Sequence, residues 1–164
     1  MLHIKTRTIG CLAGVLLLGL TSCKPPVPPT DLSKENIIPQ PISITATGNA
    51  FVLTDDSDIY VEGPEELKQI GQYLADKLNP STGFDMKVAS TTGAPKSGNI
   101  HLTLSADPQL GEEGYELNIT NNLLKLAANK PAGLFRGIQT LRQVLPAKIE
   151  LSTHSMGRGK FQRA

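Results

Sequence analysis

Residues 115–145 decide how this chain folds, and they read YELNITNNLLKLAANKPAGLFRGIQTLRQVL. Every second residue from 115 to 119 is apolar, Asn121-Asn122 forms a polar turn, and the alternation resumes over 124–128. Alternation on both sides of a short polar turn is typical of two half-buried antiparallel strands. The first part of this stretch therefore predicts a β-hairpin.

The second part predicts an amphipathic helix over 132–145, after a break at Lys130-Pro131. Its apolar residues recur every three or four positions, which places them on one side of a helix. That side carries Leu134, Phe135, Ile138, Leu141, Val144 and Leu145. A helix with this pattern must bury its apolar side against another layer, and we expect that layer to be a sheet.

A similar helix is expected over 64–78, opened by Pro64 and closed by Pro80 and Gly83. Its apolar residues at three- and four-residue spacing are Leu67, Ile70, Leu74 and Leu78. Alternation and turn residues also predict a hairpin from Ile42 to Leu53 around Gly48-Asn49, and strands at 59–61, 86–88 and 100–104.

These elements indicate an α+β fold, in which a mostly antiparallel sheet is covered on one face by the two helices. A doubly wound parallel sheet would need strict alternation of strand and helix, and that order is missing. The residues expected in one core are Leu67, Ile70, Leu74, Leu117, Ile119, Leu126, Phe135, Ile138 and Leu141.

Residues 1–22 are expected to be a lipoprotein signal peptide. Lys5 and Arg7 precede a ten-residue apolar run at 11–20, which is far shorter than the roughly 20 residues that span a bilayer. The run ends in LTSC, which is similar to a bacterial lipobox whose cysteine, here Cys23, receives lipid. The alternative is an ordinary secretory peptide that contains this cysteine by chance.

Residues 23–36 are expected to be a spacer, in which the proline-rich run KPPVPP at 24–29 is stiff and would hold a folded domain away from a membrane surface. We expect the folded domain at 37–148 and a truncated or atypical tail at 149–164. The expected location is a bacterial cell-envelope membrane, facing the periplasm or the cell surface, with the acylated Cys23 in the lipid bilayer. Lys24, which directly follows Cys23, is compatible with delivery of the lipoprotein to the outer membrane.

Composition excludes several classes of function. The formal charge is +1, and without the two leader cations 14 basic side chains face 15 acidic ones, so no nucleic-acid partner is expected. The cysteines are Cys11 and Cys23 and the histidines are His3, His101 and His154, which form no metal-binding pattern. No metal, cofactor or catalytic residue is predicted, and His101 is expected to be an ordinary strand residue.

Three pairs of adjacent acids could suggest glycosidase chemistry, which uses two carboxyl groups on either side of a sugar. They are Asp55-Asp56, Glu65-Glu66 and Glu112-Glu113. Neighbouring side chains in a turn or at a helix start point apart, so each pair is interpreted as a turn former or as a partner of the helix dipole.

Four segments carry a resemblance to a known family, in the same order along the chain. They are IPQP at 38–41, EGYELNI at 113–119, LKLAA at 124–128 and AGLFRGIQTLRQVLP at 132–146. Together they resemble the amino-terminal, zincin-like accessory domain of the family 20 β-N-acetylhexosaminidases. Gly133 and Gly137, four residues apart in this signature, would let the helix approach the sheet closely.

The resemblance implies a lipoprotein enzyme that removes terminal N-acetylglucosamine or N-acetylgalactosamine from glycans. In that family an Asp-Glu pair on a following (β/α)8 barrel carries out the reaction. Only 18 residues follow Pro146, whereas a barrel needs roughly 200 or more. Arg158-Gly159 matches only the first two positions of the barrel's opening motif, so no catalytic residue carries over to this chain.

We therefore expect a fragment that holds the accessory domain, is inactive alone, and has the catalytic barrel as its partner in the full enzyme. The aminosugar glycan would be the substrate of that enzyme. The alternative is a free-standing, lipid-anchored glycan-binding or interaction module, although Trp is absent and aromatic residues make up only 4% of the chain. A structural lipoprotein unrelated to sugars would leave the signature unexplained.

Overall fold

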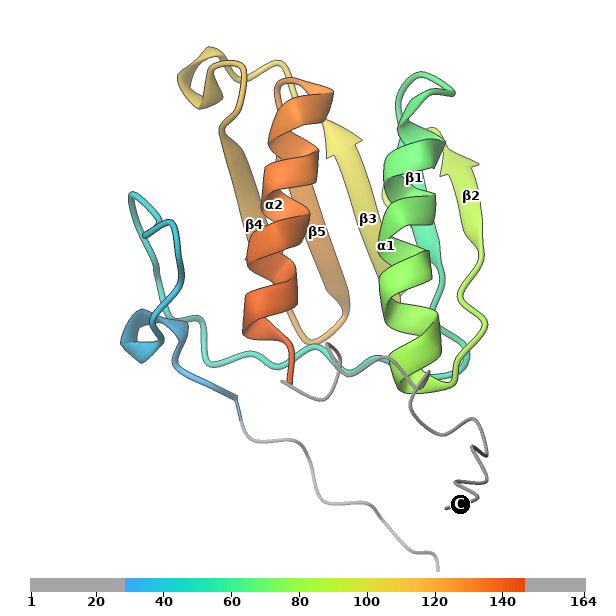
Figure 1. Ribbon diagram of the computed structural model, residues 1–164, viewed down its shortest axis with the longest axis horizontal. Helices are drawn as coiled ribbons and strands as arrows, with labels where there is room; N and C mark the ends of the chain where they lie inside the picture. The colour runs from blue at the N-terminus through green and yellow to red at the C-terminus, as the bar shows by residue number, and fades with distance from the viewer. Residues whose placement is uncertain (1–28, 147–164) are drawn as a thin grey trace, which may run out of the picture.

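A computed structural model describes residues 29–146, which form one five-stranded sheet with two helices lying side by side on one face (Figure 1). The strands are β1 (Ile59–Glu62), β2 (Val88–Thr91), β3 (Asn99–Leu104), β4 (Tyr115–Ile119) and β5 (Leu123–Ala128), in the spatial order β2-β1-β3-β5-β4. The helices are α1 (Leu67–Thr82) and α2 (Pro131–Val144), and two 3-10 turns are η1 (Leu32–Lys34) and η2 (Pro108–Leu110). The α+β class and the placement of both helices on one face are confirmed.

The expectation of a mostly antiparallel sheet is wrong. Strand β1 is parallel to β2 and to β3, and β3 is parallel to β5, so only the β4 and β5 pair is antiparallel. That antiparallel pair is the hairpin predicted over 115–128. Strands β1, β2 and β3 are parallel because α1 and the segment 92–98 each return the chain to the end of the sheet where the previous strand began. Strand β5 is parallel to β3 because β4, which comes between them in the chain, runs in the opposite direction.

The hairpin predicted from Ile42 to Leu53 is also wrong, since these residues form no strand. Gly48 does adopt a positive φ of 68°, and Ile42 is fully exposed. Instead of pairing with itself, the segment is held by the turn between β4 and β5, where the Ala50 amide donates to Asn121 Oδ1 at 2.9 Å. The predicted turn at Gly48-Asn49 is therefore not followed by a strand ladder, and a side chain of the neighbouring turn takes the Ala50 amide.

Helix α2 starts and ends within one residue of the expected bounds, whereas α1 starts at Leu67 rather than at residue 64. Pro131 occupies the first turn of α2, where a missing amide donor costs nothing. Helix α1 continues through Pro80 and ends at Thr82, later than the expected end at residue 78. Gly83 closes α1 with a positive φ of 77°, and its amide donates to Asn79 O at 2.9 Å. Neither helix of the described part is long and apolar enough to cross a membrane.

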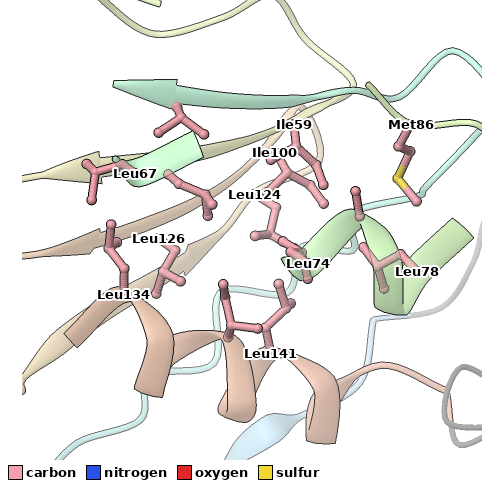
Figure 2. Packing of buried hydrophobic residues seen from close by; sticks show 14 of the residues in the cluster. Ile59, Leu67, Leu74, Leu78, Met86, Ile100, Leu124, Leu126, Leu134 and Leu141 are labelled. Atoms are coloured by element: carbon pink, nitrogen blue, oxygen red, sulfur yellow. The ribbon is translucent and has the colours of Figure 1, made fainter. Parts of the chain in front are cut away.

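The core lies between the helices and the sheet. Figure 2 shows Leu74 and Leu78 of α1 and Leu134 and Leu141 of α2 pointing toward the apolar side chains of the central strands. The buried apolar cluster comprises Ile59, Val61, Leu67, Leu74, Ala75, Leu78, Met86, Ile100, Leu102, Leu124, Leu126, Ala128, Leu134, Ile138 and Leu141.

The predicted core is confirmed for most of its members, with one correction. Ile70, Leu117 and Ile119 pack against the cluster while partly exposed. Phe135, however, is 45% exposed, because Leu134, Ile138 and Leu141 take the side of α2 that faces the sheet. Its ring lies instead against Tyr73 of α1, with ring centroids 5.1 Å apart.

The close approach expected at the signature glycines is present. A Cβ atom at Gly137 would lie 2.3 Å from Leu126 Cδ1, so α2 rests directly on the side chains of β5. Gly71 plays the same part in α1, where a Cβ would lie 2.8 Å from both Val61 and Val88. Both helices therefore sit close to the sheet because they lack side chains at these contact points.

Candidate functional site

The three acid pairs lie apart on the surface of the described residues. Asp55-Asp56 stands in a turn before β1, and Glu65-Glu66 stands before α1, where Glu65 meets Lys68 at 2.7 Å. Glu113 forms an ion pair with Arg136 of α2 at 2.7 Å. All six acids are exposed. Residues 29–146 hold no group of three or more His, Cys, Asp or Glu side chains that could bind a metal ion.

Several residues named from the sequence lie outside the described residues. They are Cys11, Cys23, His3, His154, Arg158 and Gly159.

A small polar cluster lies on the face of the sheet opposite the helices. His101 of β3 is only 2% exposed, and its Nε2 lies 3.1 Å from Glu62 Oε2 on β1. The Thr103 hydroxyl donates to the same carboxylate oxygen at 3.1 Å. The contact with His101 is close enough for an ion pair but misses hydrogen-bond geometry, and neither imidazole nitrogen has a hydrogen-bond partner in this part of the chain.

Burial sets the charge of His101. Loss of water lowers the pKa of the imidazole below its ordinary value, and Lys125 on β5 lowers it further, while Glu62 acts in the opposite direction. The direction of the shift keeps His101 neutral near pH 7. The contacts of Glu62 with His101 and Thr103 join β1 to β3.

The sequence predicts part of this cluster. His101 is the strand-face residue expected from the alternation in 99–104, and Thr103 follows on the same face. Glu62 was not predicted to join them. The parallel register that pairs Tyr60 with His101 and Glu62 with Thr103 links strands about 40 residues apart, and no local pattern reveals it.

A second cluster bridges the outer surfaces of the two helices, and we call it the aromatic seam. It consists of Tyr73 and Lys77 of α1 and of Phe135, Gln139 and Arg142 of α2. The Tyr73 hydroxyl oxygen accepts hydrogen bonds from Gln139 Nε2 and Arg142 Nη1, both at 3.4 Å, and Arg142 Nη1 also donates to Gln139 Oε1 at 2.8 Å. Lys77 Nζ lies 5.6 Å from the centre of the Tyr73 ring.

The seam was missed by the sequence analysis, which placed Phe135 in the core. The available signal was the spacing of positions 135, 139 and 142, which follow one line along a helix. The sequence does not show that α1 lies beside this line.

Comparison with known proteins identifies the family. Residues 34–161 match the model of glycosyl hydrolase family 20, domain 2. A β-hexosaminidase of Porphyromonas gingivalis is 37% identical over 118 residues, which make up 71% of this chain and 15% of that protein. A β-N-acetylhexosaminidase of Cellulomonas fimi is 34% identical over 110 residues, which make up 66% of this chain and 22% of that protein.

A solved structure agrees with these matches. The family 20 β-N-acetylhexosaminidase of Streptomyces coelicolor A3(2) superimposes with a TM-score of 0.67 and 39% identity, covering 76% of this chain and 24% of that enzyme. The chain thus spans a quarter or less of each of these three proteins. It belongs to glycosyl hydrolase family 20 and contains the family's domain 2, a non-catalytic part of a larger enzyme.

Proposed function

We propose that this chain serves as the accessory domain of a β-N-acetylhexosaminidase, which removes terminal N-acetylglucosamine or N-acetylgalactosamine from glycans. The observation that carries the proposal is the match over 34–161 to one domain of enzymes that are several times longer. The catalytic barrel of the full enzyme is then the partner of this domain, and the aminosugar glycan is the substrate of the enzyme.

The placement of the acids supports a non-catalytic role for the described residues. A glycosidase general acid needs to be near its partner group and shielded from water, so that it carries a proton near pH 7. The exposed pairs at 55–56, 65–66 and 112–113 meet neither condition. The chemistry therefore belongs to the catalytic portion that the relatives carry in addition to this domain.

An exchange of domains tests the proposal. The Streptomyces coelicolor enzyme is prepared in three forms: complete, without its own domain 2, and with residues 24–164 of this chain in place of that domain. We expect removal to shorten the half-life of activity on heating, because the catalytic portion loses a packing partner, and replacement to restore much of it. A replaced enzyme that is inactivated as fast as the shortened one would refute the proposal.

We further propose that the protein is a bacterial lipoprotein, acylated at Cys23 and held in a cell-envelope membrane. The support is the leader at 1–22 with its LTSC ending and the proline-rich spacer that follows. Each buried methylene of an acyl chain contributes about 0.8 kcal/mol, so two or more chains would hold the domain stably at the membrane.

A further inference from the structure

We propose that Gln143 is a latch that fixes the spacer at 23–36 to the folded domain, so that spacer and domain move as one unit at the membrane. The inference rests on the proposed anchoring at Cys23 and names the contact that makes the anchor rigid. The latch joins Ile38 to the last turn of α2, and Figure 1 shows the amino-terminal segment, in blue, beside the lower end of that helix.

The first argument is the form of the contact. The Ile38 amide donates to Gln143 Oε1 at 2.9 Å, and Gln143 Nε2 donates to the Ile38 carbonyl oxygen at 2.7 Å. A glutamine amide group carries both an acceptor and donors, so it can pair with the N–H and C=O of one residue as a neighbouring strand would. The Ile38 side chain is 75% exposed. Gln143 therefore holds the backbone at position 38 and not its side chain.

The second argument is that few other contacts tie this segment to the domain. Among the described residues, the hydrogen bonds that join 29–46 to the rest of the domain are the two at Gln143. The next attachments along the chain are the hydrogen bonds of Thr47 and Ala50 to β4 and to the turn that follows it. Without the latch, the segment would depend on Ile37, whose side chain is 8% exposed.

The third argument is that the chain is stiff on the anchor side of the latch. The proline-rich run at 24–29 is expected to be extended. The turn η1 that follows is closed from within, because Asp31 Oδ1 accepts hydrogen bonds from the Ser33 amide at 3.1 Å and from the Ser33 hydroxyl at 2.6 Å. Lys34 also forms an ion pair with Asp31 at 3.3 Å. A stiff spacer positions a domain only if its far end is fixed, and the contact at Ile38 fixes it.

The latch lies at one end of the sheet. Strand β4 and helix α2 both run toward the turn at 120–122, so Gln143 is at that end of the domain, whereas η2 precedes β4 and lies at the other end. Figure 1 shows η2 at the upper end of the sheet and the end of α2 at the lower one. Release of the latch would let the domain pivot about Thr47 and Ala50. The distance between the spacer and η2 would then vary.

A distance measurement on the mature lipoprotein tests the latch. Spin labels are attached at Thr30→Cys in the spacer and at Gln109→Cys in η2, and both native residues are exposed. Cys11 leaves with the leader and Cys23 is acylated, so the two introduced cysteines take the labels. Pulsed electron paramagnetic resonance of the acylated protein in detergent should give a narrow distance distribution. Gln143→Leu, which loses both hydrogen bonds, should give a broad one.

Amide hydrogen exchange tests the contact itself. Exchange of the Ile38 amide should be about tenfold faster or more in Gln143→Leu, which corresponds to about 1.4 kcal/mol of protection. Gln143→Glu should give an intermediate rate, because a carboxylate still accepts from the amide but cannot donate to the carbonyl oxygen.

Gln40→Leu is the matched control, since Gln40 is an exposed glutamine of the same segment and is not part of the latch. It should change neither the exchange of the Ile38 amide nor the distance distribution. The melting temperature of Gln143→Leu should stay close to that of the unmodified protein, because Gln143 is exposed and lies outside the buried cluster. This result would exclude a loss of fold.

The possible failures are distinguishable. A distribution that stays narrow in Gln143→Leu, a broad one in the protein with native Gln143, or unchanged exchange of the Ile38 amide would overturn the latch and leave the anchoring proposal standing. If Cys23 is not acylated, the anchoring proposal itself is refuted, and the role of the latch at the membrane fails with it.

Discussion

Gly133 lies directly against the backbone of Gly114, so that a Cβ atom at position 133 would come within 2.3 Å of the Gly114 carbonyl oxygen. The same atom would lie 2.9 Å from the Cβ of Ala128. The first turn of α2 is therefore seated between the chain entering β4 and the end of β5. This contact explains physically why the Ala-Gly pair of the family signature stands at the start of the helix.

Gly133→Ala should destabilise the domain. The added methyl group meets a backbone atom that cannot rotate away, which costs about 1–3 kcal/mol. The better helix propensity of alanine returns at most about 1 kcal/mol. Urea denaturation followed by circular dichroism should show a net decrease in the free energy of unfolding. Gly93→Ala is the control, because a Cβ there has nothing within 4 Å, and its stability should change by less than about 0.5 kcal/mol. Equal stabilities of the two variants would contradict this contact.

The buried His101 should make the domain less stable in mild acid. Its pKa is lowered in the folded state, chiefly by burial, whereas in the unfolded chain it titrates near 6.5. The stability gained from the neutral imidazole is thus fully present above pH 6.5 and is lost as pH falls through the lowered folded pKa. The slope reaches at most about 1.4 kcal/mol per pH unit.

Urea denaturation between pH 8 and pH 5 measures this loss. His101→Gln should flatten the dependence in that range, because glutamine does not titrate. A variant that loses stability with the same slope as the unmodified protein would show that another group is responsible.

The hydroxyl groups of Tyr115 and Thr140 are hydrogen-bonded to each other and join β4 to α2. Tyr115→Phe should cost about 1–3 kcal/mol, since it leaves the Thr140 hydroxyl, at a residue that is 5% exposed, without this partner. Thr140→Val should lower the free energy of unfolding much less in the Tyr115→Phe variant than in the unmodified protein. Additive losses in this double-mutant cycle would mean that the two groups do not interact.

Local patterns predicted the parts of the fold that depend on neighbouring residues. The hairpin at 115–128, both helices and the close contacts at Gly133 and Gly137 all follow from spacing within short segments. The parallel pairing of β1 between β2 and β3 does not, because it depends on segments 30 to 40 residues apart. Phe135 was misplaced for the same reason. It stands at the edge of the apolar side of α2, and whether such a residue is buried depends on how α1 lies beside it, which the local sequence does not show.

The anchoring proposal predicts a simple change in partitioning. In cells that process lipoproteins, the unmodified chain should enter the detergent phase of a Triton X-114 extract, because acyl chains on Cys23 are buried there. Cys23→Ala should move the protein to the aqueous phase or leave it with an uncleaved leader, as judged by intact mass. Cys11→Ala is the matched control and should partition like the unmodified protein. Detergent-phase recovery of the processed Cys23→Ala protein would show that lipid on this residue is not the anchor.

The central claim is that this domain belongs to a β-N-acetylhexosaminidase without carrying its chemistry. The measurement that tests it most directly is turnover of a chromogenic N-acetylglucosaminide by the purified chain, beside the enzyme in which residues 24–164 replace domain 2 of the Streptomyces coelicolor protein. We predict turnover by the exchanged enzyme and none by the chain alone, because the acid pairs at 55–56, 65–66 and 112–113 are exposed to water. Reproducible turnover by the chain alone, retained through a further purification step and lost when one of its own acids is replaced, would contradict the account.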